Sequence, residues 1–156
     1  MEVFFACARV GLIIQPLNWR LGEDELISIV EDGGPKIVVY ADEYSSLQRQ
    51  LKKTIAADHW LCFGADSDNS YESLLSQSST TEPPVAAEIG DDDPVMILYT
   101  GGTTGRSKGA LHSHKSIYMG MLNQTVAERV VPTDVYMLTG QMFHIPIALA
   151  INYMAH

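Results

Sequence analysis

The feature that most constrains this fold is an apolar run that ends abruptly in glycine and threonine. Residues 95–99, "VMILY", are too apolar and too rich in strand-forming side chains to lie at a surface, so they predict an interior strand. The stretch "TGGTTGRSKG", residues 100–109, follows directly. Because open α/β sheets bind ligands where strands end, we expect this loop to form a binding site.

The composition of the loop favours an anion. Its glycines let several backbone N–H groups turn toward one point, its threonines add hydroxyl donors, and its lysine adds a mobile positive charge. This combination suits a polyphosphate better than a single carboxylate. The alternative, a glycine-rich hairpin joining two strands, stays open because both residue types are common in turns. The predicted phosphate-binding residues are Thr100, Gly101, Gly102, Thr103, Thr104, Gly105 and Lys108.

The loop differs from the Walker A pattern GxxxxGK[ST]. Lys108 precedes the last glycine, Gly109, instead of following one. The next residues, "ALHSH" at 110–114, alternate as a strand does. We therefore expect no helix N-terminus directly behind the bound phosphates.

Helix-like and strand-like segments alternate along the chain, which predicts an α/β domain with a layered, largely parallel sheet flanked by helices. Residues 65–94 are polar and acidic and predict an exposed connection, in which only "YESLLS" is helical. Strands are predicted at residues 12–18, 36–41, 60–64, 95–99 and 134–140, and helices at about 1–11, 22–35, 42–55 and 114–130.

Charge and composition exclude several classes of function. The 156 residues carry a formal net charge of −9, so no basic face is expected for nucleic acid. No apolar run approaches the roughly 20 residues of a membrane-spanning helix, and no signal peptide is expected. Cys7 and Cys62 lie in apolar surroundings and predict buried thiols in a reducing cytoplasm.

The segment "LYTGGTTGRSKG" resembles the phosphate-loop signature of the adenylate-forming (AMP-binding) superfamily, whose usual form is YTSGTTGxPKG. Gly101 stands where the family usually has serine, and Ser107 where it usually has proline. "PLNWRL", "HSHKSI" and "GQMFHIPIALAINYMAH" are similar to further family segments, in the family's order. The likeness spans nearly the whole chain but only a middle portion of the family's large N-terminal domain.

The resemblance implies a two-step ligase reaction. A carboxylate attacks the α-phosphate of ATP, giving an acyl-adenylate and pyrophosphate, and the thiol of coenzyme A then attacks the acyl carbon. By resemblance, Thr100 to Lys108 would hold the outer phosphates, with the hydroxyl of Thr103 or Thr104 near magnesium. The acid is expected to be a fatty acid or another hydrophobic carboxylic acid.

Two histidines are implied in the site, His114 as support for the loop and His144 beside the acyl pocket. The residue pattern alone favours a different interpretation of His144, a core histidine hydrogen-bonded to backbone. On a strand, His112 and His114 share a face, but no third ligand at useful spacing supports a metal site. The acidic triplet Asp91–Asp93 is most simply a solvated end of a loop.

We expect residues 1–156 to form part of an adenylation domain. The family's glutamate, ribose-binding aspartate, hinge and C-terminal lysine have no counterpart here, so the chain is expected to be inactive in isolation. Two alternatives stay open for its function. The domain could pass its acyl group to a carrier protein, or the chain could be a non-catalytic, truncated nucleotide-binding remnant.

Overall fold

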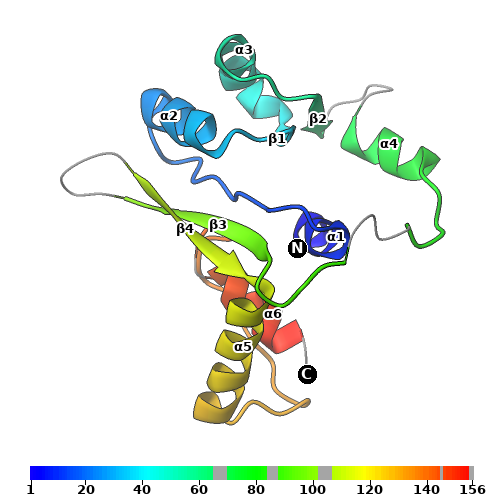
Figure 1. The fold of residues 1–156 in the computed structure, drawn as a ribbon, viewed down its shortest axis with the longest axis vertical. Coiled ribbons are helices and arrows are strands. Elements are labelled where there is room, and N and C mark those ends of the chain that lie inside the picture. The colour runs from blue at the N-terminus through cyan, green and yellow to red at the C-terminus, as the bar shows by residue number, and fades with distance from the viewer. Residues whose placement is uncertain (65–69, 84–87, 102–106, 145, 155–156) are drawn as a thin grey trace. The chain divides into compact units, whose positions relative to one another are not determined.

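The computed structural model describes residues 1–64, 70–83, 88–101, 107–144 and 146–154 (Figure 1). The chain divides into two compact units, unit 1 with Met1–Asn18 and Pro84–His156, and unit 2 with Trp19–Pro83. Each unit combines helices with a two-stranded sheet. The predicted α/β class is therefore confirmed.

Unit 2 is built around a parallel strand pair. β1 (Ile37–Ala41) pairs with β2 (His59–Phe63) in the register Ile37↔His59, and the helix between them supplies the crossover that a parallel pair requires. The predicted strands at 36–41 and 60–64 and the helical turn in "YESLLS" are confirmed. The elements in chain order are α2 (Glu23–Gly33), β1 (Ile37–Ala41), the 3₁₀ helix η1 (Asp42–Tyr44), α3 (Ser45–Thr54), β2 (His59–Phe63) and α4 (Tyr71–Gln77).

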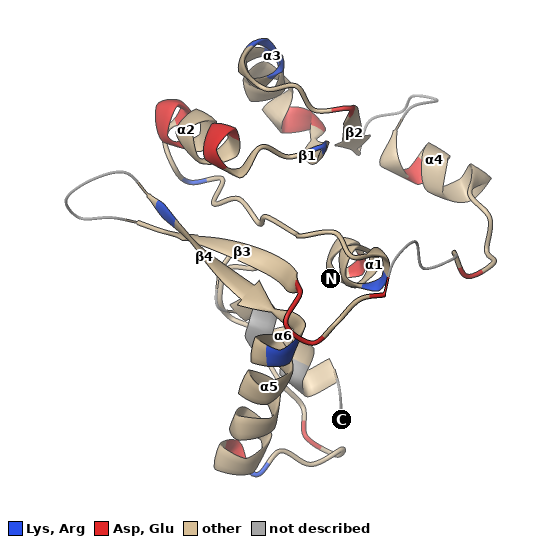
Figure 2. Ribbon diagram, viewed as in Figure 1, with Lys and Arg blue, Asp and Glu red and all other residues tan. Residues whose placement is uncertain are grey.

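Helix α2 forms as its local sequence predicts. Three acidic residues occupy its first turn, where the positive end of the helix dipole stabilises them, and the red segments of the α2 ribbon in Figure 2 mark acidic residues of this helix. Leu26, Ile29 and Val30 are buried on its inner face. The helix ends at Gly34, whose φ of 55° is a left-handed conformation and whose N–H donates to Val30 O.

Unit 1 is built around an antiparallel hairpin. β3 (Pro94–Thr100) pairs with β4 (Lys108–Ser113), and the last pair in the register is Thr100↔Lys108. The predicted interior strand, the strand that follows the loop and the long helix after it are all confirmed. The elements in chain order are α1 (Glu2–Val10), β3 (Pro94–Thr100), β4 (Lys108–Ser113), α5 (His114–Glu128) and α6 (Pro146–Met154).

The core of unit 1 gathers around β3. Val95 is 1% exposed and Met96 is completely buried. These two side chains, together with Leu98, pack with Phe4 from α1 and with Ile147 and Ile151 from α6. Burial of each large apolar side chain stabilises the fold by about 1.5–3 kcal/mol. The strand that leads into the glycine loop is therefore a firmly anchored element.

Two predicted strands are wrong. Residues 12–18 contribute only an isolated parallel bridge, Ile14↔Met96, because Pro16 has no N–H with which to continue a ladder. Residues 134–140 form no strand and pair with none of the described strands. In that segment Val135 is 97% exposed and Met137 is 78% exposed, so the apolar run does not enter the core of unit 1.

The helix expected at 42–55 is divided into η1 and α3. The Ser45 hydroxyl donates to the backbone O of Asp42 at 2.7 Å and contacts Asp42 Oδ1 at 3.0 Å. Such local side-chain bonds compete with the regular helical ladder. The regular helix therefore begins only at Ser45.

None of the helices in the described part of the chain combines the length and hydrophobicity needed to span a bilayer.

Candidate functional site

The β3–β4 hairpin brings both ends of the glycine loop together. Thr100 and Lys108 are register partners, and the Thr100 hydroxyl donates a long hydrogen bond of 3.4 Å to Lys108 O. The hairpin alternative is thus correct for the backbone, and it is compatible with phosphate binding at the loop. Four predicted phosphate-binding residues, Gly102, Thr103, Thr104 and Gly105, lie outside the described residues.

The described members of the predicted phosphate site are open to solvent. Thr100, Gly101 and Lys108 are all exposed, and a side chain at Gly101 would meet no atom within 4 Å. The hairpin therefore presents an exposed hydroxyl, an unobstructed backbone and an exposed ammonium group at one end of a buried strand. This arrangement can accept a large anion without displacing core side chains.

The structure does not place His112 and His114 on one face of a strand, although the sequence predicted it. The strand stops at Ser113, whose hydroxyl oxygen accepts from Ser116 N–H at 3.2 Å and caps α5. His114 is the first residue of this helix, so His112 and His114 do not lie on one strand face. Among the described residues no group of three His, Cys, Asp or Glu side chains could hold a metal ion.

The acidic turn before β3 has a structural role that the sequence did not predict. His114 N–H donates to Asp93 O at 3.0 Å, and Lys115 N–H donates to Asp91 O at 2.8 Å. Asp93 Oδ2 also accepts from Gly90 N–H at 2.8 Å. The side chains of this turn are exposed, as expected, while its backbone carbonyls satisfy the first N–H groups of α5. No side-chain pattern in the sequence could have indicated these contacts with α5, because backbone carbonyls make them.

His114 lies away from the glycine loop. The six residues of β4 separate it from the loop, roughly 20 Å along a strand. Its Nε2 atom is buried and has no hydrogen-bond partner within the described residues. The ring lines an apolar cleft of about 160 Å³ in unit 1, beside Phe4 and Ile117. The support of the loop by His114 stays a prediction. Such support would have to act through β4, which lies between His114 and the loop.

His144 is placed where a ligand could reach it. The residue is exposed, which contradicts its interpretation as a core histidine. Its backbone N–H donates to Gln141 O at 3.2 Å, and its O accepts from Ile147 N–H at 3.0 Å. The turn that carries His144 is thereby joined to the first turn of α6.

The cysteines offer no candidate nucleophile. Cys7 and Cys62 are free thiols, and the prediction of buried thiols is confirmed for Cys62, whereas Cys7 is half-buried. Burial raises the pKa of the Cys7 thiol. This thiol therefore stays protonated at neutral pH, the opposite of what a reactive cysteine requires.

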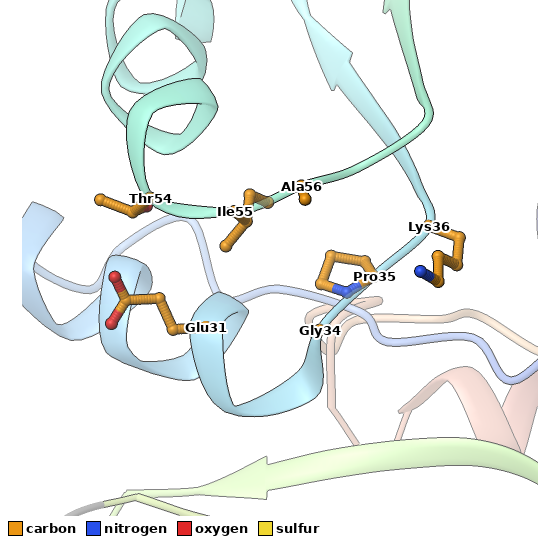
Figure 3. Close-up of a pocket in the computed structure, with 7 residues that line it drawn as sticks. All are labelled: Glu31, Gly34, Pro35, Lys36, Thr54, Ile55 and Ala56. Atoms are coloured by element: carbon orange, nitrogen blue, oxygen red, sulfur yellow. The ribbon is translucent and has the colours of Figure 1, made fainter.

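Unit 2 contains a hollow of about 280 Å³ at the end of α2 (Figure 3). Glu31 comes from α2, Lys36 from the turn that follows it, and Thr54 to Ala56 from the end of α3 and the segment after it. Gly34 and Pro35 complete the lining. None of the predicted site residues lies here, so the hollow does not belong to the predicted phosphate site.

Comparisons with known proteins assign the chain to a family. The family model described as "AMP-binding enzyme" matches residues 1–155. The long-chain-fatty-acid–CoA ligase FadD13 of Mycobacterium tuberculosis is 31% identical over 98% of this chain, and the indoleacetate–CoA ligase of Aromatoleum aromaticum is 30% identical over 93%. The chain spans about 30% of the length of these relatives.

A solved structure supports the same assignment. ATP-bound MatB from Rhodopseudomonas palustris is 29% identical and superposes with a TM-score of 0.84. The superposition covers 97% of this chain and 30% of that one. Because the family model matches all but the last residue and a relative is 31% identical over 98% of the chain, the chain belongs to the AMP-binding enzyme family.

Proposed function

We propose that this chain forms the ATP-phosphate-binding part of an acid–thiol ligase, an acyl-CoA synthetase. The observation that carries the proposal is the hairpin in which the buried strand β3 leads into "TGGTTGRSKG" and pairs Thr100 with Lys108. The exposed Lys108 ammonium group would contact the outer phosphates of ATP and stabilise the charge that moves to the departing pyrophosphate. The ATP-bound state of MatB supports ATP as the nucleotide.

The carboxylic acid is proposed to be hydrophobic. Long-chain fatty acids and indoleacetate, the acids in the names of two relatives, share an apolar body and one carboxylate. His144, exposed at the end of the connection that precedes α6, is proposed to lie beside the acyl group. Magnesium would arrive with the nucleotide and neutralise phosphate charge, with the hydroxyl of Thr103 or Thr104 as a protein contact. The free cysteines support a reducing, cytoplasmic location.

The test is carboxylate-dependent exchange of labelled pyrophosphate into ATP by the full-length protein. We expect Lys108→Ala to slow this exchange roughly 10- to 100-fold, because a charge-assisted hydrogen bond to phosphate is lost. Lys115→Ala is the matched control, since it removes the same charge from the start of α5, at the other end of β4. An equal effect of both variants would contradict the role of Lys108, and the absence of exchange in the unaltered protein would contradict the proposed function.

The same preparation distinguishes the alternatives. An acyl-CoA synthetase must form a thioester with free coenzyme A, whereas a domain that loads a carrier protein forms the adenylate without that thioester. A non-catalytic remnant gives neither product. We expect the thioester, detected by mass spectrometry.

A further inference from the structure

The connection between α5 and α6, which carries His144 at its end, is contacted by one aromatic side chain of α6. The Tyr153 hydroxyl donates a hydrogen bond to Glu128 Oε2. The Tyr153 ring also stacks on Tyr136, with ring centroids 3.9 Å apart and planes inclined by 2°. Tyr153 therefore makes a polar contact with one residue and a stacking contact with another.

These contacts join three places that are distant in sequence. Glu128 is the last residue of α5, Tyr136 lies within the connection, and Tyr153 lies on α6. The two helices also pack against each other. Because His144 O accepts from Ile147 N–H in the first turn of α6, any rotation of α6 would move His144. Tyr153 thus ties α6 to the start and the middle of the connection, while the backbone bond of His144 ties the end of the connection to α6.

The Glu128 carboxylate is itself oriented. Its second oxygen, Oε1, accepts from Gln124 Nε2 at 3.1 Å, one turn earlier on α5. The hydrogen bond to Glu128 is the largest cause that raises the pKa of Tyr153 to about 12, above the ordinary value of 10.0. The phenol therefore keeps its proton, and hence its bond to Glu128, to a higher pH than an ordinary tyrosine would.

We propose that Tyr153 is a positioning residue for His144, acting through its two contacts with Glu128 and Tyr136. This inference rests on the proposed function, in which His144 lies beside the carboxylic acid. It goes beyond that function because it assigns specificity for the acid to a side chain outside the acyl site.

Two variants alter the polar contact between Tyr153 and Glu128, and two more serve as references. Tyr153→Phe keeps the aromatic ring and removes the hydrogen bond, and Glu128→Gln keeps an acceptor and removes its charge. Tyr118→Phe is the matched control, because Tyr118 is an exposed tyrosine of α5 whose hydroxyl makes no hydrogen bond within the described residues. His144→Ala measures the contribution of the histidine itself.

The kinetic test measures KM separately for the carboxylic acid and for ATP in the full-length enzyme. We expect Tyr153→Phe to raise KM for the acid about three- to tenfold, the effect of one solvent-screened hydrogen bond. KM for ATP and the kinetics of Tyr118→Phe should not change. If His144→Ala raises KM for the acid but Tyr153→Phe does not, the positioning role is wrong. If His144→Ala has no effect, the proposed acyl role of His144 fails instead.

A second measurement does not depend on activity. Ultraviolet titration of phenolate should show a raised pKa that is present in the unaltered protein and absent from Tyr153→Phe, and Glu128→Gln should lower it. Hydrogen exchange in residues 129–144 should become faster in Tyr153→Phe and remain unchanged in Tyr118→Phe. Unchanged exchange in Tyr153→Phe would overturn the proposal.

Discussion

Gly101 shows how one residue can alter the proposed phosphate site without altering the fold. It stands at the end of β3, where the family usually has serine, and it leaves open space where a side chain would be. The glycine keeps the backbone N–H donors and lacks one hydroxyl. The role of this position can therefore be tested by adding a hydroxyl group instead of removing one.

We expect Gly101→Ser to lower KM for ATP about two- to tenfold, the range of one added neutral hydrogen bond. Gly101→Ala is the control, because it adds a side chain of similar size without the hydroxyl. Steady-state kinetics of the full-length enzyme with ATP as the varied substrate measure both. An equal change in the two variants would mean that the hydroxyl is not responsible.

At the scale of elements, the close packing of the β3–β4 hairpin depends on Gly109, because glycine has no side chain. A Cβ at this position would lie 2.6 Å from Ile97 Cδ1, 2.9 Å from Ile97 Cγ1 and 3.1 Å from Tyr99 Cζ. These side chains belong to the opposite strand, so they must move if Gly109 is replaced. The glycine that closes the loop signature thus also allows the two strands to pack closely.

We expect Gly109→Ala to lower the free energy of unfolding by about 1–3 kcal/mol, the usual cost of overpacking. Gly120→Ala on α5 is the matched control, since its Cβ meets nothing within 4 Å. That variant should stabilise the protein by about 0.5–1 kcal/mol through helix propensity. Denaturant unfolding compares them, and equal effects of the two alanines would contradict the packing argument.

The same scale explains which elements could be predicted from sequence. α1 and α2 end at Gly11 and Gly34, and both glycines have the positive φ that a helix cap requires. Such signals are local, so they are readable in sequence. The strands predicted at residues 12–18 and 134–140 do not form, because a strand exists only when a distant segment pairs with it along its length. For the site, the motif identified the loop, whereas the Asp91–Asp93 contacts with α5 were invisible because backbone carbonyls make them.

At the scale of the molecule, unit 1 has an anchored core and a large amount of exposed apolar surface. Val126, Val135 and Met137 are each more than three-quarters exposed. Monomeric proteins seldom expose large clusters of such side chains without a partner. Relatives of the chain are about three times its length, so further polypeptide is a natural candidate to cover this surface.

The double variant Val135→Ser, Met137→Ser tests this idea. If further polypeptide covers both side chains, we expect the change to lower the free energy of unfolding of the full-length protein by about 2–4 kcal/mol, because two buried apolar side chains are replaced. In the 156-residue chain the same change should alter stability by less than about 0.5 kcal/mol, since these side chains are already exposed. It should also reduce aggregation there. An equally small effect in both proteins would mean that the surface stays open to solvent, because a substitution at an uncovered position removes no packing in either context.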